Sequence, residues 1–170
     1  MVSKIKKNTK IKINSEKYIQ GLLLIGYFTG LCAGSYFIFS STENAAFANN
    51  VLNFGTIKSL VYFPVALILK YSGILSGALC TLTFFSGIQN SAAYCNNILN
   101  SNNNYIYSTV ITMFKDTAVL MLLILYITII INQVINGKYN IKKDFKYFSV
   151  YFCGAAIINI FEYILKNFIF

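Results

Sequence analysis

The feature that most constrains this chain is an uncharged apolar run of 22 residues, from Tyr18 to Phe39. At a rise of 1.5 Å per residue, about 20 residues cross the hydrocarbon core of a bilayer as an α-helix. Only 11% of the 170 residues are charged and 56% are hydrophobic, whereas roughly a quarter of a soluble domain is charged. The sequence therefore predicts an all-α, polytopic membrane bundle, with a single transmembrane domain over residues 18–170.

A basic tail over residues 1–17 precedes the first span and sets its orientation. Its six lysines are Lys4, Lys6, Lys7, Lys10, Lys12 and Lys17. The apolar core of a cleaved signal peptide is about 7–15 residues long, so the longer run after this tail reads as a retained signal anchor. Lysines favour the cytoplasmic side, which places the N-terminus there. The tail is also expected to attract anionic membrane lipids, at about 1 kcal/mol per lysine.

The number of spans depends on the middle of the chain. Residues 105–135 and 147–170 are each long enough for one crossing. The 49 residues from Val51 to Leu99 fit either one over-long helix or two ordinary helices. Two helices would be joined near Lys70 and Gly73, or near Ser86 and Gly87.

The charge of a later loop favours two helices, and not one, in the middle of the chain. Residues 136–147 carry Lys138, Lys142, Lys143 and Lys146 against the single acid Asp144, and such a short basic loop prefers the cytoplasm. An even number of crossings must separate two cytoplasmic segments. We therefore expect five spans and an external C-terminus. The spans are about 18–40, 52–70 or 60–85, 74–99 or 87–104, 105–135 and 147–169. Four spans are the alternative, with residues 87–104 only dipping into the membrane.

Glycines recur at helical spacing on two of the predicted spans. Gly26, Gly30 and Gly34 follow one another every four residues, and Gly73 and Gly77 repeat the spacing once. Such a bare ridge allows a neighbouring helix to approach closely. Two interpretations stay open: the ridge packs against another helix of the same chain, or it docks a partner membrane protein.

Four polar or charged residues fall inside the predicted spans: Gln89, Lys115, Asp116 and Glu162. A charge at bilayer depth costs about 2.5–3.5 kcal/mol even on the lenient insertion scale, so each should face protein, water or the interface. Lys115 and Asp116 are adjacent, about 100° apart on a helix, and are not expected to pair as an i,i+4 couple would. Lys115 and Glu162 lie at comparable depths and are predicted to pair between helices. Either a structural ion pair or an ion or proton relay would fit.

The sequence offers little to an enzyme. It contains no His, the commonest general base and metal ligand, and no phosphate-binding glycine loop, paired catalytic carboxylates or activated nucleophile can be assembled. We predict no catalytic residues, no cofactor and no metal. The net charge of +9 comes from lysines at the ends of apolar runs, which is typical of membrane topology and not of nucleic-acid binding.

The order of features resembles the stage II sporulation protein M family. The residues that carry the resemblance are Tyr18-Ile19 and Thr29-Gly30 through Gly34-Ser35-Tyr36 in the first span, and Ile160-Phe161-Glu162-Tyr163-Ile164-Leu165 in the last. The latter is similar to the family's closing Leu-Glu-Ala-Tyr-Leu pattern. Between them, Phe85-Ser86-Gly87 through Met121 is similar to the family's central block in spacing.

This resemblance implies a non-enzymatic scaffold in the cell membrane of an endospore-forming bacterium. Such a scaffold assembles a peptidoglycan-degrading complex for forespore engulfment, and its partners would be membrane-anchored cell-wall hydrolases. A homo-oligomer is compatible with the same reading. The alternative is a small transporter or channel subunit, in which Lys115, Asp116, Glu162, Gln89 and Asn90 converge on a wet cavity.

Overall fold

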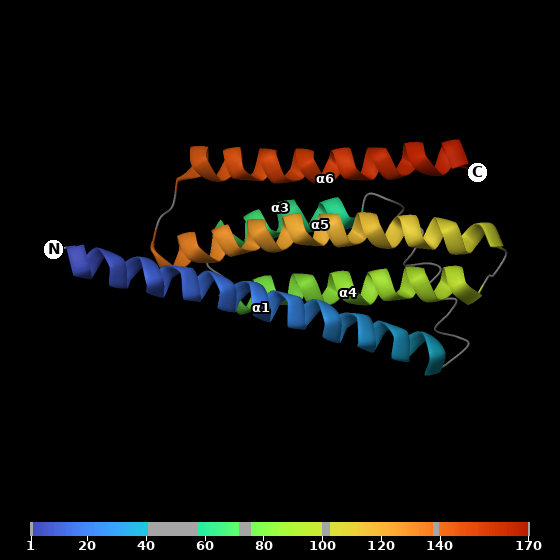
Figure 1. The fold of residues 1–170 in the computed structure, drawn as a ribbon, viewed down its shortest axis with the longest axis horizontal. Helices are drawn as coiled ribbons and strands as arrows, with labels where there is room; N and C mark the ends of the chain where they lie inside the picture. Colours follow the sequence, from blue (N-terminus) through green and yellow to red (C-terminus); the bar gives the residue numbers. More distant parts are fainter. Residues whose placement is uncertain (1, 41–57, 72–75, 100–102, 138–139, 170) are drawn as a thin grey trace.

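The computed structural model describes residues 2–40, 58–71, 76–99, 103–137 and 140–169. This part of the chain forms five α-helices, labelled as in Figure 1. They are α1 (Val2–Ser40), α3 (Lys58–Tyr71), α4 (Ser76–Leu99), α5 (Asn103–Ile135) and α6 (Ile141–Ile169). The predicted all-α class is confirmed for these residues.

Successive helices run in alternate directions along one long axis (Figure 1). The start of α1 lies at the same end of the bundle as the link between α5 and α6, and the C-terminus lies at the opposite end. A hydrogen bond joins α1 to α5 near this end of the bundle. Asn132 Nδ2, near the end of α5, donates it to Glu16 Oε1 of α1 at 3.2 Å. The basic N-terminal segment and the basic link therefore lie at one end of the bundle, as they must if an even number of crossings separates them.

The middle of the chain is a helical hairpin. The helix α3 ends at Tyr71 and α4 begins at Ser76, so the break lies next to Lys70. The alternative break at Ser86 and Gly87 is wrong, because both residues lie within α4. The helix also continues to Leu99 through most of the segment that the four-span alternative treats as a shallow dip.

A glycine and an asparagine define the turn between α5 and α6. Gly137 has a φ of +61°, a left-handed conformation that glycine adopts without steric cost at the end of a helix. Asn140 then accepts a hydrogen bond of 3.2 Å from the Lys143 amide on its Oδ1 atom, which caps the start of α6. The last helix consequently begins at Ile141, six residues earlier than the expected span.

Among the residues that the structure describes, three helices are long and apolar enough to cross a membrane: Glu16–Ser40, Tyr107–Ile135 and Ile141–Phe168. A shorter apolar helix covers Ser59–Tyr71. These lengths and compositions indicate a multi-pass membrane protein.

The bundle has an apolar exterior and several charges inside. Phe114 and Phe168 expose 75% and 87% of their surface, whereas Lys70 and Glu162 expose 2% and 3%. The core is built around α5, where Tyr126 packs on Phe63 of α3 at a ring-centroid distance of 5.6 Å. Large apolar side chains that face outward gain nothing from contact with water, whereas lipid solvates them well. This distribution of side chains suits a lipid environment.

Candidate functional site

Helix α1 crosses α4 so closely that three glycines are required. A Cβ atom placed on Gly30 would collide with the backbone carbonyl oxygen of Phe84, and one on Gly87 would collide with that of Tyr27. At Gly34, one turn further along α1, a Cβ would lie 2.8 Å from the Ile88 carbonyl oxygen. Only hydrogen atoms fit at these positions, which is how small residues let membrane helices pack backbone to backbone.

The predicted glycine ridge is therefore occupied by the chain itself at Gly30 and Gly34. Gly26 is half-buried, Gly73 lies outside the described residues, and of Gly77 only its position in α4 is described. Sequence reasoning missed the partner residue, Gly87. The signal was present, because a glycine interrupting an apolar helix weakens it unless close packing compensates.

A cluster of four charged side chains lies between α5 and α6. The predicted pair is confirmed, with Lys115 Nζ 3.3 Å from Glu162 Oε2. Lys115 Nζ also lies 2.8 Å from Asp116 Oδ1, so the expectation that these neighbours do not pair is wrong. The four methylenes of lysine let its ammonium bend back across the 100° between them. Lys166 completes the cluster at 2.9 Å from Glu162 Oε1.

Two hydroxyl groups add hydrogen bonds to the carboxylates of this cluster. The Thr112 hydroxyl donates to Glu162 Oε1 at 3.0 Å and accepts from Lys166 Nζ at 2.8 Å. The Tyr94 hydroxyl of α4 donates to Asp116 Oδ2 at 2.9 Å. Glu162 Oε2 accepts no hydrogen bond and is held by its ion pair with Lys115 alone. With two lysines and two carboxylates, the cluster is formally neutral.

The same network reaches the first helix. Asn90, one turn before Tyr94 on α4, donates a hydrogen bond of 3.1 Å from its Nδ2 atom to the hydroxyl of Tyr27 in α1. Gln89 points elsewhere, because its Oε1 atom accepts a bond of 2.6 Å from the Tyr62 hydroxyl of α3. The polar residues singled out in the sequence thus join α1, α4, α5 and α6 in one network, while Gln89 joins α3 to α4.

A second buried ion pair lies at the end of the bundle that holds the α5–α6 link. Lys70 Nζ of α3 is 2.5 Å from Asp144 Oδ2 of α6, with side-chain exposures of 0% and 3%. The same ammonium donates to Gln133 Oε1 of α5 at 2.6 Å, and the Tyr71 hydroxyl donates to Asp144 at 2.5 Å. Sequence reasoning assigned Lys70 to a turn and missed this pair. A lysine that follows the apolar stretch of α3 and a lone acid in a basic segment were the available signal.

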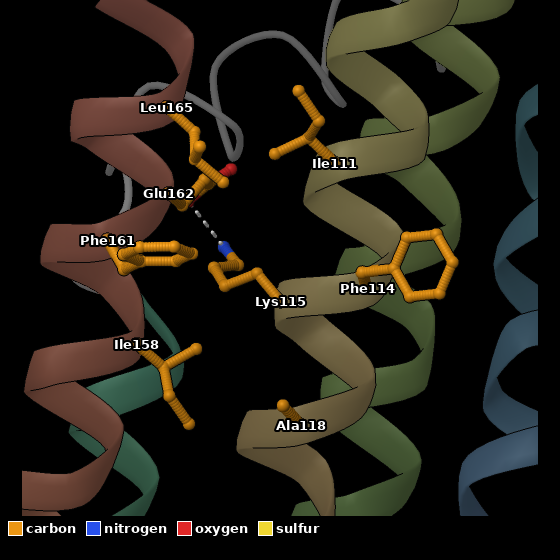
Figure 2. A pocket seen from close by; sticks show the side chains of 8 residues that line it. All are labelled: Ile111, Phe114, Lys115, Ala118, Ile158, Phe161, Glu162 and Leu165. Atoms are coloured by element: carbon orange, nitrogen blue, oxygen red, sulfur yellow. Dashed lines mark ion pairs between the residues drawn. The ribbon is translucent and has the colours of Figure 1, made fainter.

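An open groove runs along the seam between α5 and α6 (Figure 2). Its volume is about 370 Å³, and Lys115 and Glu162 point toward one another across its floor. The other lining residues are apolar: Ile111, Phe114, Ala118, Ile158, Phe161 and Leu165. The paired charges therefore lie in a groove whose other lining residues are aliphatic and aromatic.

These contacts join the described helices to one another. In the part of the chain that the structure describes, no three Cys, Asp or Glu side chains gather as a metal site would need. Comparisons of the chain with known protein families, with curated proteins and with solved structures find no match. The resemblance to the sporulation family stays a prediction from the residues quoted for it.

Proposed function

We propose that this protein is a five-span scaffold of the bacterial cell membrane, with its N-terminus in the cytoplasm and its C-terminus outside. In this proposal it is not an enzyme. Its role is to hold membrane-anchored partners, which the family resemblance identifies as peptidoglycan-degrading enzymes that act in forespore engulfment.

The observation that carries the proposal is that the charges inside the bundle neutralise one another. Lys70 pairs with Asp144, and Lys115, Asp116, Glu162 and Lys166 form one neutral cluster. Breaking a buried pair by removing one partner costs about 3–5 kcal/mol. Any movement that separates these partners would leave a buried charge uncompensated, so the ion pairs among α3, α5 and α6 favour one fixed arrangement of these helices over a carrier that must alternate between two states.

Partners would dock on the outer surface of the bundle. The glycine face of α1 is used by α4 at Gly30 and Gly34, so it does not serve as the partner surface there. Helix α6 is more available, because only 17% of its most apolar stretch is buried, against 50% in α5. Its exposed large side chains include Ile157, Ile160, Phe161, Ile164 and Phe168.

The second candidate function is a small transporter or channel subunit, and the groove at Lys115 and Glu162 is the observation in its favour. Intramembrane ionisable residues that border a cavity commonly mark an ion or proton path. In that reading Lys115 would exchange partners between Asp116 and Glu162 as the groove fills, and the protein would oligomerise to complete the path.

The scaffold proposal is tested in an endospore-forming host that carries this gene. Deleting it should stop development at engulfment, and the tagged protein should co-purify with cell-wall hydrolases from the sporulating membrane. An α6 variant with Ile157→Ala and Ile160→Ala should lose the hydrolases while the protein stays folded in the membrane. Normal engulfment together with ion-dependent growth defects would favour the transporter instead.

A further inference from the structure

A shallow hollow lies on the outer face of α1, next to Glu16, whose hydrogen bond with Asn132 places this part of α1 beside the last turns of α5. Its volume is about 390 Å³, and it is lined by Lys17, Tyr18, Gly21, Leu22 and Ile25. A Cβ atom on Gly21 would meet nothing within 4 Å. The glycine therefore serves no helix contact in the described part of the chain, and its missing side chain leaves the hollow.

The charge at the mouth of this hollow is available to a ligand. Glu16, next to Lys17, turns toward α5 and accepts the bond from Asn132. Lys17 is exposed, and the ion pairs found among the described residues do not involve it. Tyr18 exposes 77% of its surface beside it, and an exposed tyrosine with its apolar ring and polar hydroxyl is typical of the head-group level of a membrane.

We propose that this hollow binds an anionic phospholipid of the cytoplasmic leaflet. The Lys17 ammonium receives the phosphate, and one acyl chain lies along Gly21, Leu22 and Ile25. The lining suits both parts of such a lipid, because it offers a cation at the level of the head groups and an apolar wall toward the membrane centre. The leaflet follows from the proposed topology, since the cytoplasmic leaflet is the negatively charged one. The scaffold role itself is not needed for this site.

The site differs from the general attraction of a basic surface. Lys142, Lys143 and Lys146 are also exposed at this end of the bundle, and each should draw anionic lipid to the membrane patch around the protein. None of them lines the hollow. A larger side chain that fills the hollow should therefore weaken lipid binding at this site although the charge of the protein is unchanged. A purely electrostatic attraction would not respond to such a substitution.

The experiment uses the full chain in vesicles and a single reporter. The protein contains no Trp, so Phe28→Trp, an exposed aromatic position one turn beyond Ile25 on the same face, provides the only indole fluorescence. Quenching by phosphatidylglycerol with brominated acyl chains, relative to brominated phosphatidylcholine, measures the preference of the site. Lys17→Gln should reduce that preference about five-fold.

Two further variants decide the interpretation. A Cβ at Gly21 meets no neighbour within 4 Å, so Gly21→Leu should keep the thermal midpoint while abolishing most of the preference. Lys143→Gln is the matched charge control and should leave the preference unchanged. The proposal is overturned if Gly21→Leu behaves like the parent, or if Lys143→Gln loses as much as Lys17→Gln. It is equally overturned if neither lipid quenches the reporter, because a second protein then covers the face.

Discussion

Gly30 of α1 and Gly87 of α4 face each other where their helices cross. A Cβ on Gly30 would lie 3.2 Å from Gly87 Cα, and a Cβ on Gly87 would lie 3.1 Å from the Gly30 carbonyl carbon. Each glycine thus makes room for the other's backbone. The close approach also brings Ser35 Oγ to 2.8 Å from Ser91 Oγ, a hydrogen bond between the two helices.

Replacing Gly30 with alanine should destabilise the bundle. The new methyl group collides with the Phe84 carbonyl, and backbone cannot move aside as a flexible side chain can. Overpacking of this kind costs about 1–3 kcal/mol or more. The loss would be measured as a lower midpoint of unfolding in mild detergent. Gly21→Ala is the matched control on the same helix, and an equal loss there would refute the close-packing explanation.

The Lys115–Glu162 pair should show energetic coupling. Lys115→Leu and Glu162→Leu each leave the buried cluster with one uncompensated charge, and such a loss costs up to about 3–5 kcal/mol. The double variant leaves Asp116 with Tyr94 and Lys166 with Thr112, so its loss should fall short of the sum by about 0.5–3 kcal/mol. The free energies of unfolding of the four proteins test this. Simple additivity would show that the two side chains act independently.

The Lys70–Asp144 pair should be more sensitive to the loss of one partner than of both. Lys70→Met leaves the Asp144 carboxylate buried beside Tyr71, with its Oδ1 atom already lacking a hydrogen bond. We expect a loss of about 3–5 kcal/mol for Lys70→Met, and a smaller loss for Lys70→Met with Asp144→Leu. Thermal unfolding compares them. A double variant as unstable as Lys70→Met would contradict a role for the charge itself.

The helices and their directions followed from the sequence because they depend on length, hydrophobicity and lysine position, which are local quantities. The break between the two middle helices had two possible positions, near Lys70 or near Gly87. Sequence could not choose between them, because glycine occurs both at turns and where helices cross closely. Gly87 looked like a turn by itself. Only its juxtaposition with Gly30, 57 positions earlier in the chain, reveals its role.

The charged site was predictable in part for a similar reason. Lys115 and Glu162 could be matched by their depths in two spans, because helix rise is constant. The bond between Lys115 and Asp116 could not, because it depends on how a flexible side chain bends within the site. Tyr94, Thr112 and Lys166 were missed because hydroxyl groups and a lysine near a helix end also occur as ordinary interfacial residues.

Accessibility of introduced cysteines tests the proposed topology most directly. In a variant without Cys32, Cys80, Cys95 and Cys153, single cysteines replace Asn140 or Asn167, which are both exposed and lie at opposite ends of α6. A membrane-impermeant thiol reagent added to intact cells should label position 167 at once and position 140 only after the membrane is opened. Labelling of position 140 in intact cells, or labelling of both positions from one side, would contradict the five-span account.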